Sequence, residues 1–187
     1  MDNLYIQKVL NGDYTGFSYF VDKCKDMGYS IAFRIVNNSE DAEEIVQDSF
    51  VKAFKSLNKF RQDSKFSTWF YRIVVNGSLS KVERRKTNSG YIDLENVSDV
   101  AIEEIESIYN HLTHADQQKY INIALNELNV EDRLLLTLYY LNENSLEEIS
   151  EITEIKNENL KMKIHRARQK MYIVLEKELK SEIKNLL

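Results

Sequence analysis

Residues 41–57 have the sequence DAEEIVQDSFVKAFKSL, in which apolar side chains recur three and four positions apart. This spacing places them on one side of an α-helix and leaves the charged residues on the other side. The segment Ser39-Glu40-Asp41 supplies a cap and negative charge for the first turn. The apolar stripe consists of Ala42, Ile45, Val46, Phe50, Ala53, Phe54 and Leu57. We therefore predict an amphipathic helix that packs into a helical bundle.

The same periodicity recurs along most of the chain. It predicts helices at about 17–31, from 66 onward, at 120–128, at 131–141, at 145–153 and from about 157 onward. The 187 residues include no proline and only five glycines, which disfavours collagen-like, proline-rich and loop-heavy β designs. We therefore predict an all-α protein with two small helical domains. Residues 1–86 form an N-terminal helical bundle, 87–118 a flexible acidic linker, and 119–187 a helix-turn-helix domain.

Cysteine content and hydropathy bear on the compartment. The single cysteine, Cys24, excludes an internal disulfide and a cysteine-based zinc site, which fits a reducing environment. No signal peptide and no run of eighteen apolar residues is visible in the sequence. We expect a soluble cytoplasmic protein without a membrane segment of its own.

Charge is segregated along the chain although the net value is only -5. Residues 51–88 contain ten basic and two acidic residues, and residues 156–187 contain nine and four. Between them, residues 89–118 contain seven acidic residues and no Lys or Arg. Two basic blocks separated by an acidic stretch favour two contact surfaces for a polyanion.

Residues 145–170 have the layout of a helix-turn-helix motif. Ser145 and Glu148 form a capping-box pattern at the start of the short helix 145–153. A second helix follows a brief turn and directs Leu160, Ile164, Ala167, Met171 and Leu175 inward. Its outer face bears Asn157, Glu158, Asn159, Lys161, Met162, Lys163, His165, Arg166 and Arg168, residue types that read base edges and hold phosphates in a major groove. An ordinary helical hairpin with a solvated charged face is the alternative.

Residues 60–86 contain aromatic residues interspersed with basic and hydroxyl-bearing residues. Such a surface can stack unpaired bases and follow a phosphate backbone. Phe66, Phe70 and Ile73 fall at helical spacing and are assigned to packing. The contact candidates are Phe60, Arg61, Lys65, Arg72, Asn76, Lys81, Arg84, Arg85 and Lys86.

Three segments carry a family resemblance, and they occur in the family's order over roughly residues 1–175. They are DAEEIVQDSF at 41–50, FSTWFYRI at 66–73 followed by Asn76, and SLEEI at 145–149 together with HRAR at 165–168. With them the chain resembles the extracytoplasmic-function (ECF) group of the sigma-70 family of bacterial RNA polymerase sigma factors. These proteins direct transcription initiation at specific promoters.

The resemblance implies a role for each segment. The outer face of helix 41–55, with Asp41, Glu44, Gln47, Asp48 and Lys52, would bind the clamp coiled coil of core RNA polymerase. The loop 60–65 with Asn76 would capture a base flipped from the −10 promoter element and assist DNA melting. The second domain would read the −35 element as duplex and face the polymerase flap. An anti-sigma factor is a further partner that the family implies.

The chain departs from the family pattern at several positions. Asn129-Val130 stands where Leu-Pro is usual, Glu154 where a turn glycine is usual, and Ser80 where an aspartate often occurs. Glu158-Asn159-Leu160 replaces the usual Gly-Thr-Val at the start of the recognition helix. Because an αL turn favours glycine, we expect an altered backbone at Glu154. Base preferences of better-matched relatives are therefore not transferred to this chain.

Enzymatic signals are weak. His111 and His114 lack a third metal ligand at ordinary spacing, and the glycines form no phosphate-binding loop. We expect no catalytic residues, no metal and no cofactor. Two alternatives stay open: a helix-turn-helix regulator that binds DNA without polymerase, and a helical adaptor whose basic blocks bind acidic proteins.

Overall fold

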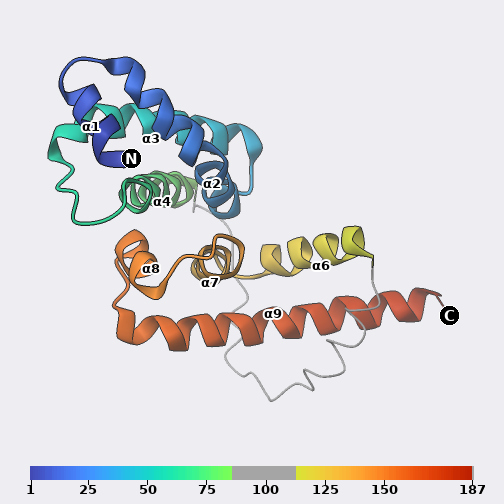
Figure 1. Ribbon diagram of the computed structural model, residues 1–187. Helices are drawn as coiled ribbons and strands as arrows, with labels where there is room; N and C mark the ends of the chain where they lie inside the picture. Colours follow the sequence, from blue (N-terminus) through green and yellow to red (C-terminus); the bar gives the residue numbers. More distant parts are fainter. Residues whose placement is uncertain (86–112, 187) are drawn as a thin grey trace.

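The computed structural model describes residues 1–85 and 113–186 of the chain (Figure 1). Within these ranges every regular element is helical, as the sequence predicts. The first unit consists of α1 (Asp2–Leu10), η1 (Tyr14–Phe17), α2 (Ser18–Val36), α3 (Ser39–Ser56), η2 (Leu57–Lys59) and α4 (Phe66–Arg85). Helix α2 packs against both α3 and α4. Phe20, Phe66 and Phe70 are fully buried at the centre of this bundle.

Helix α3 follows its predicted stripe closely. Five of the seven stripe residues are buried, whereas Phe50 is half-buried and Phe54 lies at the exposed edge against Tyr14 and Phe17. The predicted cap was wrong by one residue. The side chain of Asn38, rather than Ser39, accepts a hydrogen bond of 2.9 Å from the backbone N–H of Asp41. The extended backbone of Asn38 places its side-chain oxygen near the free N–H groups of the first turn.

The second unit consists of α6 (His114–Glu127), α7 (Val130–Leu136), η3 (Thr137–Leu141), α8 (Leu146–Thr153) and α9 (Asn157–Leu186). Helix α6 begins at His114, so residues 114–118, which we assigned to the linker, are helical. The predicted helix 131–141 is α7 followed by a π-helical turn, η3. The interior of this segment is buried as predicted, but Tyr139, Tyr140 and Leu141 at its end are exposed.

The two units pack directly on each other. Helix α4 lies against α8, and α2 lies against α7 (Figure 1). One continuous cluster of buried apolar side chains includes Phe70 of α4 together with Leu135 of α7 and Ile149 of α8. The guanidinium of Arg34 donates a hydrogen bond of 2.8 Å to the side-chain oxygen of Asn122 across the same boundary. In this arrangement each unit covers part of the other's surface.

Candidate nucleic-acid interface

A hollow lies beside the loop that connects η2 to α4. Its volume is about 410 Å³, and its lining consists of Lys59, Phe60, Arg61, Asp63, Ser64, Thr68, Trp69, Arg72 and Glu151. The Phe60 ring stacks on Trp69 with their centroids 4.9 Å apart, and its edge meets the buried Phe66 ring. Aromatic faces beside guanidinium groups suit the stacking of an unpaired base next to its phosphate. The structure thus brings Phe60, Arg61 and Arg72 together, as expected for residues of one contact surface.

Two of the basic candidates point toward the second unit. The ammonium of Lys65 lies 2.7 Å from a carboxylate oxygen of Glu148, and the guanidinium of Arg72 pairs with Glu154. Both acids belong to α8 or its C-terminal cap. Lys65 and Arg72 are therefore engaged within the chain in this arrangement.

The remaining described −10 candidates lie elsewhere. Asn76, Lys81 and Arg84 line a second hollow of about 410 Å³ between α3 and α4. The Lys81 ammonium lies 2.7 Å from Glu44 and 3.2 Å from Asp41. Hydrogen bonds to these two carboxylates raise the pKa of Lys81. The described part of the candidate set therefore forms two surfaces rather than one. Lys86 and the side chain of Arg85 lie outside the described residues.

The candidate polymerase-binding residues divide in the same way. Glu44, Gln47, Asp48 and Lys52 are exposed on α3, in agreement with their predicted face. The placement of Asp41 on that face was wrong, because its side chain is buried between α3 and α4 and pairs with Lys81. Helical periodicity alone does not show that α4 lies over the first turn of α3.

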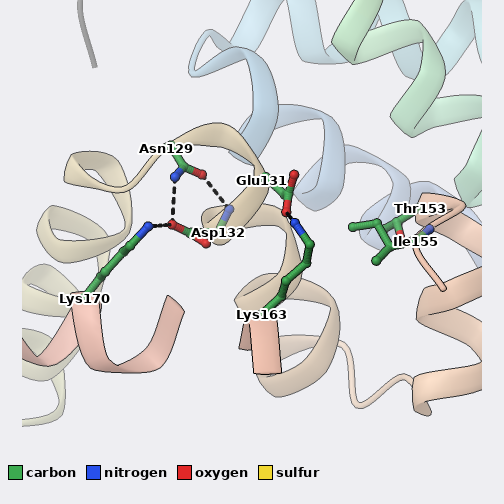
Figure 2. Close-up of polar contacts among 7 residues, drawn as sticks. All are labelled: Asn129, Glu131, Asp132, Thr153, Ile155, Lys163 and Lys170. Carbon is green, nitrogen blue, oxygen red and sulfur yellow. Dashed lines mark hydrogen bonds and ion pairs between the residues drawn. The ribbon is translucent and has the colours of Figure 1, made fainter. Parts of the chain in front are cut away.

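Helix α9 presents the predicted polar face opposite its buried stripe. Leu160, Ile164, Ala167 and Leu175 are buried, and Met171 is half-buried. All of the −35 candidates are exposed except Lys163, which is half-buried. Lys163 instead reaches α7 and pairs with Glu131 (Figure 2). The His165 ring and Arg168 lie within hydrogen-bonding distance of each other, at 3.3 Å.

The helix-turn-helix turn keeps a glycine-like backbone without glycine. Glu154 has φ 61° and ψ 12°, in the left-handed region, so the altered backbone that we expected is not found. Its N–H donates to the Ser150 carbonyl, and the Ser150 hydroxyl donates to the Ile155 carbonyl at 2.7 Å. The Ile155 N–H then donates to the Thr153 hydroxyl (Figure 2). These bonds hold Glu154 in a conformation that costs a non-glycine residue about 1–2 kcal/mol.

Upstream of this motif, Asn129 has a defined structural role. Its side-chain oxygen accepts a hydrogen bond of 2.8 Å from the Asp132 N–H, and its amide donates to the Asp132 carboxylate at 2.7 Å. Lys170 of α9 lies 2.8 Å from the same carboxylate (Figure 2). Asn129 thus caps α7 where the family has Leu-Pro, and Lys170 fastens α7 to α9.

Two aromatic residues near the candidate surfaces were not among our predicted contacts. Trp69 lines the first hollow, and Tyr140 lies beside Arg168, which donates toward its hydroxyl at 3.5 Å. Trp69 was within the quoted segment 66–73, which could have identified it. Tyr140 had no such signal, because the π-helical turn that exposes it is not visible in the hydrophobic pattern.

Neither a metal site nor a membrane-spanning helix is present within the described ranges, 1–85 and 113–186. These residues contain no group of three or more His, Cys, Asp or Glu arranged to hold a metal ion. None of their helices is both long enough and apolar enough to cross a membrane. Of the two histidines considered above, His111 lies outside these ranges.

Comparison with known proteins identifies the family. Residues 20–87 match the model of sigma-70 region 2, and residues 120–171 match that of sigma-70 region 4. The chain is 32% identical over 176 residues to the ECF RNA polymerase sigma factor SigW of Bacillus subtilis, covering 88% of this chain and 91% of that protein. It is also 32% identical over 174 residues to the ECF RNA polymerase sigma-E factor of Escherichia coli, covering 90% and 91%.

Solved structures share the fold. CnrH, in complex with the cytosolic domain of CnrY, has a TM-score of 0.63 at 18% identity, covering 94% of this chain and 97% of that one. The sigma factor RpoE of Bartonella quintana, in complex with the anti-sigma factor NepR, has a TM-score of 0.59 at 18% identity, covering 86% and 96%. With both sigma regions present in order and two relatives matched over nearly their whole length, the chain belongs to the ECF group of the sigma-70 family of RNA polymerase sigma factors.

Proposed function

We propose that this chain joins core RNA polymerase in the cytoplasm, directs it to promoters with particular −10 and −35 elements, and assists DNA melting. The observation that carries the proposal is the exposed polar and basic face of α9. It lies opposite a buried apolar stripe in a helix-turn-helix, within a chain that also contains sigma region 2. A solvated helical hairpin would not require that second region.

The two units have different tasks in this proposal. Helix α9 enters the major groove of the −35 element, where the exposed side chains of Asn157, Lys161 and Arg166 face DNA. The first hollow receives an unstacked base of the −10 element beside the stacked rings of Phe60 and Trp69 and the neighbouring guanidinium groups. Stacking is worth about 1–3 kcal/mol per base, which helps to offset the cost of unpairing.

Partners follow from the same division. The exposed acids of α3, Glu44 and Asp48, provide charge for a basic site on core polymerase. An anti-sigma protein is a second proposed partner, because RpoE of Bartonella quintana was solved with NepR. The proposal includes no catalytic step by this chain, since polymerase performs the chemistry.

Transcription with purified core polymerase tests the function. We expect transcripts from a limited set of genomic promoters that share two spaced elements, identified by sequencing their 5′ ends. Asp48→Lys should abolish capture of core polymerase, whereas Asp26→Lys, the same change at an exposed acid on α2, should not. Specific DNA binding without any capture of polymerase would instead support the regulator.

The recognition helix is tested by salt dependence. Replacing Lys161 or Arg166 with Gln should reduce the slope of log affinity against log salt by about 0.9 for each lost phosphate contact. Lys163→Gln should have a smaller effect, because that side chain is paired with Glu131. Lys177→Gln, an exposed change near the other end of α9, is the control. An unchanged slope for Lys161 and Arg166 would remove their proposed role.

A further inference from the structure

Helix α8 turns a row of acidic side chains toward the first unit. Glu148, Glu151 and Glu154 occur at every third position and so lie along one side of the helix and its cap. Glu148 pairs with Lys65, Glu154 pairs with Arg72, and Glu151 lines the hollow beside the −10 loop. All three acids therefore meet the surface that is proposed to bind the −10 element.

Local hydrogen bonds position the two paired acids on α8 and its cap. One oxygen of Glu148 accepts from the Ser145 N–H in the capping box, and the other accepts from the Lys65 ammonium. Glu154 is fixed in the left-handed region at the C-terminal cap of α8. Glycine, which is usual at position 154 in the family, has no side chain and could not form the pair with Arg72. This contact is therefore a feature of the present sequence.

An apolar seam lies behind the ion pairs. Ile149 and Ile152 of α8 are buried in the same cluster as Phe70 and Val74 of α4. The ion pairs lie at the edge of this seam, where the side chains of Lys65 and Arg72 are 72% and 47% exposed. Burial of these apolar side chains holds the two units together. The ion pairs determine which acidic groups contact Lys65 and Arg72.

We propose that the free chain is held closed by α8, whose carboxylates occupy the positions that −10 DNA phosphates would take near Lys65 and Arg72. Building on the proposed function, this makes the second domain an internal competitor of promoter DNA. Core polymerase must separate the two units before the −10 surface can be used. Carboxylates and phosphates both satisfy Lys and Arg donors, so the two occupants exclude each other.

The expected size of the effect follows from the exposure of the pairs. Exposed ion pairs contribute little individually, so removing one should lower the ratio of closed to open chain by about threefold. Loss of both should lower it about tenfold, and high salt should act in the same direction because it screens exposed charges.

Distance measurements on the full chain test the closure without DNA or polymerase. Spin labels at Lys55→Cys on α3 and Lys177→Cys on α9 span the two units at exposed sites, while the native Cys24 is buried. With the ion pairs unmodified, these labels should give a single narrow distribution of distances. Glu148→Gln with Glu154→Gln should add a population of longer distances, and Gln at 148 can still complete the capping box. Glu147→Gln, at an exposed acid hydrogen-bonded to Asn157 within the second unit, should leave the distances unchanged.

A charge swap separates the ion pair from other effects of substitution. Glu154→Arg should open the chain, and adding Arg72→Glu should close it again by restoring an opposite-charge pair. Unchanged distances in the double Gln variant, or a swap that stays as open as Glu154→Arg, would overturn the proposal. Because these distances need no promoter, their failure leaves the sigma function intact.

The inhibitory role has its own readout. At limiting sigma concentration, the double Gln variant should increase transcription by core polymerase several-fold, and Glu147→Gln should not. An opened chain whose transcription does not rise would overturn inhibition as the consequence of closure.

Discussion

Two glycines in the first unit allow the packing between α2 and α4 to be tested quantitatively. A Cβ added at Gly28 of α2 would lie 3.1 Å from Cε1 of Phe70, whose ring is fully buried and stacked on Phe50 at 4.2 Å. The ring cannot move away without disturbing its neighbours. A Cβ added at Gly77 of α4 would lie 3.5 Å from its nearest neighbour, Ile45, which is ordinary contact.

The two Gly→Ala substitutions share one energy term and differ in another. Both gain about 1 kcal/mol, because alanine is favoured over glycine inside a helix. At Gly28 the added methyl overpacks the core, at a cost of about 1–3 kcal/mol. Gly77→Ala should therefore stabilise the protein by about 1 kcal/mol, whereas Gly28→Ala should be neutral or destabilise it by up to about 2 kcal/mol. Their difference isolates the overpacking cost.

Urea denaturation measures this difference. The only tryptophan, Trp69, lies in α4, so its fluorescence reports unfolding of the unit that contains both glycines. Midpoint shifts convert to free energy provided that the m value is the same for all variants. If Gly28→Ala were as stable as Gly77→Ala, the close contact between Gly28 and Phe70 would not exist in solution.

Three further substitutions test other parts of the structure. Ser145→Ala removes the capping box of α8 and should lower the free energy of unfolding by about 1 kcal/mol. Circular dichroism should then show thermal unfolding at a lower temperature. An unchanged transition temperature would contradict the cap. Lys170→Met leaves the buried Asp132 carboxylate without its ammonium partner and should lower the free energy of unfolding in urea by about 1–3 kcal/mol. Adding Asp132→Asn should restore most of this loss. An unchanged free energy in the single variant would exclude the pair. Burial raises the pKa of the Cys24 thiol from 9.0 to about 11, so the folded chain retains this proton where the unfolded chain loses it. The difference in unfolding free energy between the wild-type protein and Cys24→Ala should therefore be constant below pH 9. Above pH 9 the wild type should lose stability relative to Cys24→Ala by at most about 1.4 kcal/mol per pH unit. A parallel pH dependence of both proteins would contradict the raised pKa.

Much of the fold could be predicted because helices leave a regular signal. The stripes of α3 and α9 are buried as predicted, and the capping box at Ser145 is formed. Errors occurred where one residue competes with its neighbour, as Asn38 does with Ser39 at a cap. The π-helical turn at η3 was also missed, because its single irregular step does not interrupt the run of apolar residues.

The candidate site was predictable as a set of residues but not as an arrangement. Local sequence indicated that Phe60, Arg61 and Arg72 suit unpaired DNA, and the structure gathers them around one hollow. The local sequence could not show that the Lys81 side chain pairs with Asp41 and Glu44 of α3. A long side chain can reach several partners. The partner that it contacts depends on how whole helices pack, because that packing sets the position of each partner.

The sequence by itself determined which residues face inward, where charge accumulates and which family the motifs resemble. These properties depend on neighbours a few positions apart, so the period of the helix is enough to reveal them. Only the tertiary structure decided that Asp41 is covered by α4 and that Lys65 and Arg72 meet acids of α8. Residues 72 and 154 are far apart in the chain, and the position of one relative to the other follows from the apolar seam between α4 and α8 rather than from any local pattern.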